Sequence, residues 1–171
     1  MTTAQDILSI CEFHRTAISR SSMSVPARWL DDEGLIVGDI LDFGCGRGYD
    51  ANELGAVGYD PNSDDHQETP NDKFDTVVCI YVLNVIPPDE QQGCLTAIQD
   101  YLKDDNSVAY IAVRRDLEKN VEGPPQWWVE LPYDVVKETS TFCIYKMTKD
   151  SKGESVVTAS NIAELCNNRD G

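Results

Sequence analysis

The chain has 171 residues, of which 41% are hydrophobic, and its formal net charge is -16 at pH 7. This length suits one domain with one core, and the apolar content is too high for a disordered chain. Phosphate backbones repel so acidic a surface, so the charge disfavours broad nucleic-acid binding. No apolar run reaches the length of a membrane span and the N-terminus lacks a signal-peptide core, so we expect an acidic cytoplasmic protein that does not enter membranes.

The cysteines and histidines do not have the spacing of metal ligands. The 6 cysteines form no C-x-x-C pair, and the two histidines, His14 and His66, lie far apart in the sequence, so we expect no metal site. Cys79 and Cys143 lie in apolar runs and are expected to be buried thiols. Cys45 lies in a glycine-rich loop, where we expect a small packing residue, although that neighbourhood allows a lowered pKa.

Two helices are expected at the N-terminal end of the chain. Residues 4–14 have the pattern of a short helix, with Thr3 as its N-cap. Ser24 is a second N-cap candidate, because Pro26 follows in the first helical turn and Gly34 is placed to end the helix.

The rest of the chain is organised around residues 39–48, with the sequence DILDFGCGRG. An apolar strand leads into three glycines at alternate positions, Gly44, Gly46 and Gly48. Asp42 stands two residues before the first glycine. Glycines in this position allow a sharp turn, close approach of a ligand and tight packing of the helix that follows. The amides of that helix's first turn lack helical partners and can face a ligand.

The glycine spacing separates several kinds of nucleotide-binding loop. Tyr49 stands where the third glycine of a dinucleotide-binding G-x-G-x-x-G pattern would fall, so a nicotinamide-dependent oxidoreductase fits less well. A G-x-x-x-x-G-K-[ST] phosphate loop is absent from the sequence. The alternative to a binding loop is a glycine-rich turn with no ligand.

A second acidic signal follows at the end of the next expected strand, over residues 57–60. Asp60 lies at the tip of this strand, where an acid can accept hydrogen bonds from both ribose hydroxyls of an adenosine. The alternative is a turn aspartate before Pro61. Residues 61–73 are polar and too few for a crossover helix and a further strand, so we expect a sheet trimmed at this point, with the adenine end of the ligand exposed.

The second half of the chain contains two further buried strands. Residues 74–86 begin as a nearly continuous apolar run, which suits a strand covered on both faces, and Tyr81 to Asn84 would pass its tip beside the ligand. A helix is expected from Pro88 to about residue 103, followed by a strand over residues 107–113.

The C-terminal region is expected to be antiparallel. Residues 129–131 and 141–147 have the composition of two strands, and we place a short helix between them at residues 133–138. Residues 149–171 are polar and are expected to form a tail, which leaves residues 1–148 as one domain.

The D-x-G-x-G-x-G pattern and the order of elements resemble the class I S-adenosylmethionine-dependent methyltransferases. The resemblance implies a Rossmann-like α/β fold with a mostly parallel sheet, a C-terminal antiparallel pair and a missing third strand. A closer likeness is to the methyltransferase portion of the methyltransferases associated with DNA phosphorothioation systems, which are longer. Five segments carry this likeness: TAISRS at 16–21, GLI at 34–36, GCGRG at 44–48, YVLNVI at 81–86 and VRRD at 113–116.

The resemblance also implies a cofactor, S-adenosylmethionine, and the residues that bind it. Asp42 would position the amino group of the cofactor, and Asp60 would bind the ribose. The glycine loop would line the methionine end, through Gly44, Cys45, Gly46, Arg47 and Gly48. The segment from Cys79 to Tyr81 would pass close to the sulfonium. Methyl transfer needs little acid-base help when the acceptor is already nucleophilic, so alignment of the two reactants supplies much of the acceleration.

The sequence gives weaker signals for the acceptor side. Asn84 is the candidate catalytic residue, because its amide could hold the acceptor or the cofactor, and the alternative is a capping or turn asparagine. Arg20 is expected to face the cofactor carboxylate or an anionic acceptor. Trp127 and Trp128 could stack on a flat substrate, or close a core.

No [DNS]-P-P-[YFW] signature of amino-methylating enzymes is present, which weakens direct methylation of DNA bases. We therefore expect a methyltransferase with an unspecified acceptor. The alternative is a module that binds the cofactor without catalysis.

Overall fold

The computed structural model describes residues 19–117 and 125–152. The helix expected over residues 4–14, and the part of the expected tail beyond residue 152, lie outside these ranges. Within the described residues, no helix has the length and apolar character needed to cross a membrane.

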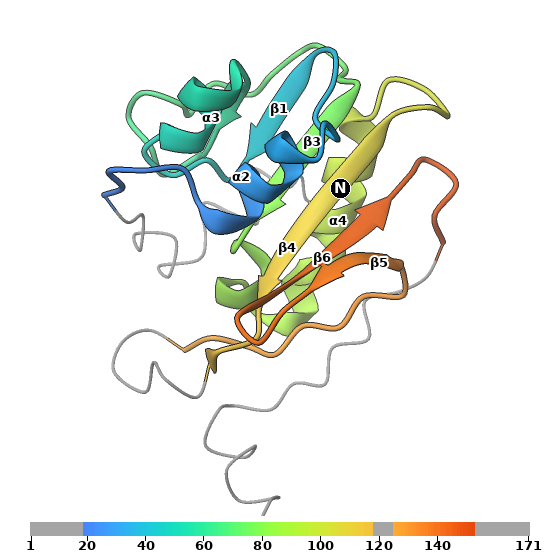
Figure 1. Cartoon of the computed structure of the whole chain (residues 1–171). Coiled ribbons are helices and arrows are strands. Elements are labelled where there is room, and N and C mark those ends of the chain that lie inside the picture. The colour runs from blue at the N-terminus through green and yellow to red at the C-terminus, as the bar shows by residue number, and fades with distance from the viewer. Residues whose placement is uncertain (1–18, 118–124, 153–171) are drawn as a thin grey trace, which may run out of the picture.

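A six-stranded sheet forms the centre of the molecule, with the strand order β2-β1-β3-β4-β6-β5 (Figure 1). The parallel strands are β1 (Ile40–Phe43), β2 (Val57–Tyr59), β3 (Thr76–Ile80) and β4 (Val108–Arg114). Two antiparallel strands follow, β5 (Asp134–Glu138) and β6 (Phe142–Met147), of which β6 pairs with β4 and β5 pairs with β6. The expected Rossmann-like α/β fold with a C-terminal antiparallel pair is confirmed.

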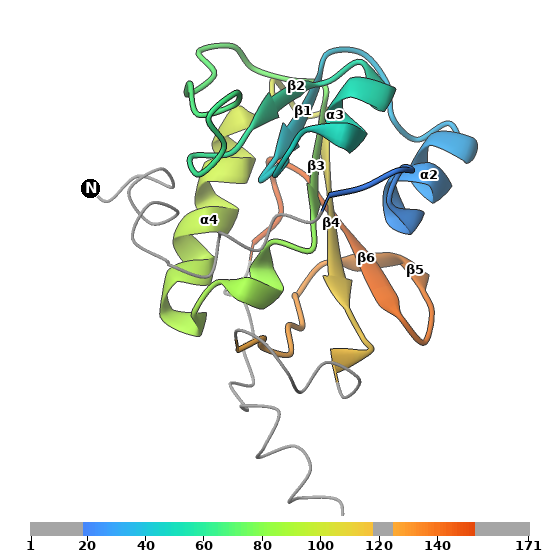
Figure 2. The same ribbon diagram turned by 90° about the vertical axis from the view of Figure 1, so that its left-hand side faces the viewer.

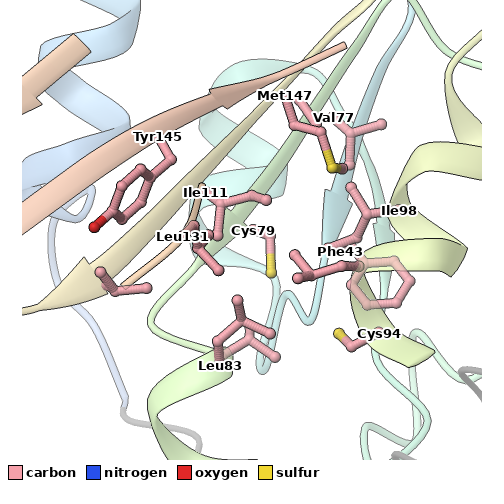
Figure 3. Close-up of a cluster of buried hydrophobic side chains, with 14 of the residues drawn as sticks. Phe43, Val77, Cys79, Leu83, Cys94, Ile98, Ile111, Leu131, Tyr145 and Met147 are labelled. Carbon is pink, nitrogen blue, oxygen red and sulfur yellow. The ribbon is translucent and has the colours of Figure 1, made fainter. Parts of the chain in front are cut away.

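Helices cover both faces of the sheet, as Figure 2 shows. On one face lies α4 (Pro88–Tyr101), and on the other lie α2 (Val25–Asp32) and α3 (Tyr49–Leu54). Side chains of β3 alternate between the two faces. Cys79 packs in the cluster that contains Ile98 of α4 (Figure 3), and Val78 packs in the cluster that contains Leu30 of α2. This two-sided burial explains the continuous apolar run that the sequence shows here.

The ends of the helices follow the sequence signals. Ser24 caps α2, because its hydroxyl accepts a hydrogen bond from the amide of Ala27 at 3.4 Å. Gly34 follows the end of this helix with φ at 68°, and Gly55 ends α3 with φ at 65°. The helix predicted between Ser24 and Gly34 therefore begins and ends close to the expected residues.

The sheet is trimmed where the sequence predicts it. Residues 61–73 form turns and bends, and β2 is an edge strand that pairs only with β1 in the described part of the chain. After this loop the chain returns to the other side of β1, where β3 pairs in parallel.

One element of the C-terminal region was predicted wrongly. Residues 133–138, expected to form a short helix, contain the strand β5, while residues 129–131, expected to form a strand, lie outside the strands. Val135 and Val136 are β-branched and favour an extended backbone, and pairing with β6 supplies hydrogen bonds that a helix this short could not hold alone. A register shift between Val135 and Lys137 marks a bulge in this edge strand.

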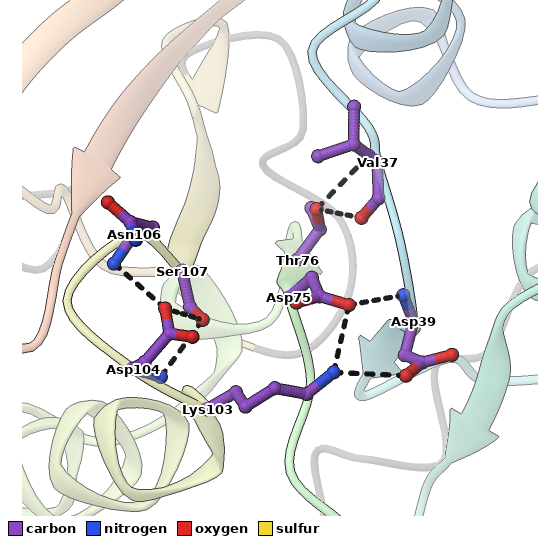
Figure 4. Close-up of polar contacts among 8 residues, drawn as sticks. All are labelled: Val37, Asp39, Asp75, Thr76, Lys103, Asp104, Asn106 and Ser107. Carbon is purple, nitrogen blue, oxygen red and sulfur yellow. Dashed lines mark hydrogen bonds and ion pairs between the residues drawn. The ribbon is translucent and has the colours of Figure 1, made fainter.

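A polar cluster ties together the N-terminal ends of β1 and β3 (Figure 4). The ammonium group of Lys103 lies 3.1 Å from the carboxylate of Asp39 and 3.0 Å from that of Asp75. Asp75 also accepts a hydrogen bond from the amide of Asp39 at 2.8 Å. This amide and then Lys103 hold the pKa of Asp75 below its usual value.

Candidate active site

The described residues form a pocket at the C-terminal ends of the parallel strands, with a cavity volume of about 180 Å³. Residues after the tips of β1, β2 and β3 line it, together with Arg114 at the end of β4. Because β1 pairs with β2 on one side and with β3 on the other, the pocket lies where the strand order reverses. Open α/β sheets bind ligands at this position.

The glycine loop after β1 is held tightly by the backbone around it. Gly44 has φ at 79°, and a Cβ atom built on it would lie 2.4 Å from Cγ2 of Val82. The carbonyl of Tyr59 accepts hydrogen bonds from the amides of Gly44 at 2.7 Å and Cys45 at 3.1 Å. A side chain at position 44 would therefore be excluded both by the backbone angle and by its neighbour.

His66 packs against the other end of the loop. A Cβ atom on Gly48, where φ is 81°, would lie 2.3 Å from Nε2 of His66. The carbonyl of His66 accepts a hydrogen bond from the amide of Asp60 at 2.9 Å. The loop after β2 therefore folds back onto the glycine loop, and Gly48 allows this close packing.

Asp42 lies in the pocket wall at the end of β1 and is buried, with 3% of its surface exposed. Burial, and then the charges of Asp50 and Asp60, raise the pKa of Asp42 to about 8, while Arg20 acts in the opposite direction. No hydrogen-bond donor in the described part of the chain reaches its carboxylate. The pocket therefore contains a carboxyl group that a cationic ligand would stabilise in its charged form.

Asp60 holds the middle of the glycine loop. One of its carboxylate oxygens accepts a hydrogen bond from the amide of Gly46 at 2.9 Å, and the other accepts one from the amide of Asn62 at 2.9 Å. The bond to Asn62 is the turn contact that the alternative reading of this residue expected. Each oxygen keeps a second lone pair, so the same carboxylate can also accept bonds from a ligand in the pocket.

Residues 20–24 cross the start of α3 beside the glycine loop. Arg20 lines the pocket, and the hydroxyl of Tyr49 donates a hydrogen bond to the carbonyl of Ser21 at 3.2 Å. The amide and the hydroxyl of Ser24 donate to the carboxylate of Asp50 at 2.8 Å and 2.5 Å. These bonds hold the segment beside the pocket.

Tyr81 stands at the tip of β3 with its backbone in the left-handed region, at φ 61°. It lines the pocket, and the guanidinium of Arg114 lies 5.9 Å from the centre of its ring. Burial raises the pKa of the Tyr81 hydroxyl. A non-glycine residue keeps this costly conformation only where its surroundings impose it, and such residues are common at functional sites.

The two cysteines expected near the cofactor differ in their relation to the pocket. The side chain of Cys79 packs in the core and does not line the pocket. Cys45 does line the pocket, but burial and the charges of Asp42 and Asp60 raise the pKa of its thiol instead of lowering it. Cys45 therefore remains a protonated packing residue.

The expected acceptor-side residues also differ from their predicted placement. Asn84 is fully buried, and its amide links the amide of Arg114 at 2.7 Å to the carbonyl of Trp127 at 2.8 Å, so it positions backbone and does not reach the pocket. Neither Trp127 nor Trp128 lines the pocket. The ring of Trp128 instead packs beneath the guanidinium of Arg115, at 4.6 Å from its centre.

The sequence reading missed several residues at or beside the pocket, among them Asp50, His66, Arg114 and Gln126. Asp50 carries a usable signal, because an acid in the first turn after a glycine loop faces the same space as the loop. His66 and Gln126 lie in irregular segments, where no periodicity indicates the direction of a side chain. Among the described residues, no group of three or more His, Cys, Asp or Glu side chains could hold a metal ion.

The sequence of residues 17–151 matches a protein family described as a methyltransferase domain. No match was found among curated protein sequences.

Solved structures share the fold at low sequence identity. The PH0226 protein from Pyrococcus horikoshii OT3 is similar to this chain with a TM-score of 0.55 and 14% identity, over 79% of this chain and 97% of that one. A protein studied for the conversion of a disulfide bond into a thioacetal group during echinomycin biosynthesis is similar with a TM-score of 0.53 and 16% identity, over 87% of this chain and 88% of that one. A TehB-like SAM-dependent methyltransferase from Corynebacterium glutamicum ATCC 13032 is similar with a TM-score of 0.51 and 20% identity, over 72% of this chain and 86% of that one.

Proposed function

This chain belongs to a methyltransferase domain family, and we propose that it is an S-adenosylmethionine-dependent methyltransferase whose pocket at the tips of β1 to β4 holds the cofactor. The observation that carries this placement is the carboxyl group of Asp42. It is buried in the pocket wall, its pKa is raised, and no donor in the described residues bonds to it. The ammonium group of the cofactor would supply the missing donor and the opposite charge.

Other groups of the cofactor find suitable partners in the same pocket. Arg20 is a cation beside Asp42 and would bind the cofactor carboxylate through its planar guanidinium. Asp60 would accept hydrogen bonds from the ribose hydroxyls with the lone pairs that Gly46 and Asn62 leave free. The loop of residues 61–73 would leave the adenine end exposed. The residues present therefore fit S-adenosylmethionine.

When bound, S-adenosylmethionine supplies an electrophilic methyl carbon on a sulfonium, which becomes a neutral thioether once the methyl group has been transferred. Two titratable side chains of the pocket are poor bases for this reaction. The thiol of Cys45 and the hydroxyl of Tyr81 both have raised pKa values and keep their protons at neutral pH. The contribution of these residues is to align the acceptor with the donor and to exclude water, which favours an acceptor that is already nucleophilic.

We propose that the enzyme is associated with a DNA phosphorothioation system. This proposal rests on the sequence likeness to the methyltransferases of such systems. The net charge of -16 supports an acceptor other than bare nucleic acid. The cytoplasmic location stays a prediction from the sequence. Residues 1–148 would form the catalytic domain and residues 149–171 a polar tail.

Calorimetry with S-adenosylhomocysteine, S-adenosylmethionine and NAD tests the proposal. We expect the first two ligands to bind and NAD to give no response. Tight NAD binding without a response to S-adenosylhomocysteine would contradict the assignment of the pocket. Formation of S-adenosylhomocysteine when the protein is incubated with a cell extract then separates a catalyst from a module that only binds the cofactor.

A further inference from the structure

Gln126 places an unused hydrogen-bond acceptor in the pocket wall. Its amide oxygen Oε1 is buried and has no donor partner among the described residues. A buried amide oxygen without a donor costs free energy, and native structures retain few of them. A pocket that keeps one is suited to a ligand that brings the donor.

The position of Gln126 is fixed by its neighbour in the chain. The amide of Trp127 donates to the carbonyl of Asn84 at 2.8 Å, and the side-chain amide of Asn84 donates to the carbonyl of Trp127 at 2.8 Å. Asn84 also accepts a bond from the amide of Arg114 at 2.7 Å. This buried asparagine therefore clamps the segment that carries Gln126 against the end of β4.

An aromatic, an aliphatic and a cationic side chain line the same pocket as Gln126. Tyr81 presents its ring from the strained tip of β3, with the guanidinium of Arg114 near its face, and Val85 lines the same pocket. Arg114 ends β4, whereas Asp60 follows β2. Because β2 and β4 are separated by β1 and β3, these residues lie at the end of the pocket opposite the proposed ribose site.

We propose that Tyr81, Arg114 and Gln126 form the acceptor subsite, and that it takes a small aromatic compound that presents an O–H or N–H group to Oε1 of Gln126. The amide oxygen only orients this group, and the displaced proton would pass to water when the methyl group is transferred. The inference rests on the proposed function, because it assumes that the cofactor fills the part of the pocket around Asp42 and Asp60. The aromatic ring of the acceptor matches the Tyr81 surface. A compound with no O–H or N–H would leave the amide oxygen unpaired, and such sites discriminate strongly against it.

Paired probes test this subsite on the full chain saturated with S-adenosylhomocysteine. Phenol is compared with anisole, and aniline with N,N-dimethylaniline, by ligand-observed NMR titration. The second member of each pair keeps the ring and has methyl groups in place of the donor hydrogens. We expect the donor of each pair to bind about tenfold more tightly, since one buried hydrogen bond is gained. Gln126→Leu should reduce this preference to about twofold or less, whereas Gln92→Leu, an exposed position on α4, should retain it.

The outcomes separate this inference from the assignment of the cofactor. A parent protein that fails to bind S-adenosylhomocysteine contradicts the proposed function itself. A parent that binds it but shows equal affinity for both members of each pair, or no affinity for any probe, overturns the acceptor subsite alone. That comparison needs no variant, so it stands even if Gln126→Leu does not fold. A folded Gln126→Leu protein, checked by its thermal midpoint, that keeps the tenfold preference also overturns it.

Discussion

The pKa values of aspartates are shifted in opposite directions at the two ends of the parallel strands. At the N-terminal end, Asp39 and Asp75 are paired with Lys103, and the pKa of Asp75 is lowered by the amide of Asp39 and by that lysine (Figure 4). At the C-terminal end, Asp42 is buried beside two other acids and its pKa is raised to about 8. At the first end, the negative charges of both aspartates are paired with a lysine of the same chain. At the second end, the carboxyl group of Asp42 has no hydrogen-bond donor among the described residues, and a cationic ligand would gain from binding beside it.

Asp42→Asn is expected to have the largest effect on binding. The substitution keeps the shape of the side chain but removes the charge that would meet the cofactor ammonium, so the Kd for S-adenosylhomocysteine should rise about 100-fold. The free protein should become more stable at pH 8, because the variant no longer buries a carboxylate. Calorimetry and thermal unfolding measure the two effects. Asp39→Asn, at the other end of β1, is the matched control, and equal losses of affinity in both variants would remove the distinction between the ends.

The same carboxyl group predicts a pH dependence. Its pKa is 3.8 in the unfolded chain and about 8 in the folded protein, so its unfavourable contribution to stability grows as the pH rises from about 4 to about 8 and is constant above that. Binding requires the charged form, so S-adenosylhomocysteine should bind more tightly as the pH rises from about 6 to about 8, by up to about tenfold per pH unit. Asp42→Asn should flatten this profile. An unchanged slope in the variant would assign the titration to another group.

Asp60→Ala should weaken cofactor binding by about 1–3 kcal/mol, because two ligand hydroxyls lose a charged acceptor. The structure adds a second cause: the variant also loses the hydrogen bonds to the amides of Gly46 and Asn62, so the glycine loop should become less protected from hydrogen exchange. Calorimetry and amide exchange measure the two effects separately. Asp65→Ala, an exposed acid in the same loop, is the control. Unchanged affinity in Asp60→Ala would leave the residue with its turn role alone.

Arg20→Lys should weaken binding of S-adenosylhomocysteine several-fold, by less than the loss of either acid. A lysine keeps the positive charge near Asp42 but cannot hold a carboxylate through two parallel hydrogen bonds. Arg28→Lys is a matched control, because Arg28 is exposed on α2 and does not line the pocket. Equal affinities of the two variants would show that Arg20 contributes only its charge.

Lys103→Met should have the smallest effect, and only on stability. Its ion pairs with Asp39 and Asp75 are exposed to solvent, so we expect a small fall in the unfolding midpoint that disappears at high salt. Lys146→Met, on the exposed side of β6, controls for the general loss of one positive charge. Any loss of cofactor affinity in Lys103→Met would contradict the separation of the two ends.

Much of the fold followed from local rules that the sequence states directly. Three glycines at alternate positions allow backbone angles that other residues avoid, and the structure has φ at 79°, 57° and 81° there. Ser24 caps its helix because a hydroxyl beside a helical first turn has a nearby amide to bind. The loop of residues 61–73 was too short for a crossover with another strand, so its length alone predicted the trimmed sheet. Each of these depends on neighbouring residues only.

The remaining features depend on contacts between distant parts of the chain. Residues 134–138 became a strand because β6 offered an open edge, and the charged residues around Val135 and Val136 gave no clear period. Asn84 was read as a ligand-facing amide, yet its partners, Arg114 and Trp127, lie 30 and 43 residues away in the sequence.

The sequence by itself determined the order of three features: an apolar strand, the glycine loop of residues 44–48, and the acid Asp60 after the next strand. This is the order found in methyltransferases. Only the tertiary structure decided which side chains face the pocket and in what charge state. Cys79 faces the core because alternate residues of a covered strand point to opposite faces, and the pKa of Asp42 is raised because folding buries it beside Asp50 and Asp60. Burial and the distances between charges are properties of the packed chain, and a pattern of residue types contains neither.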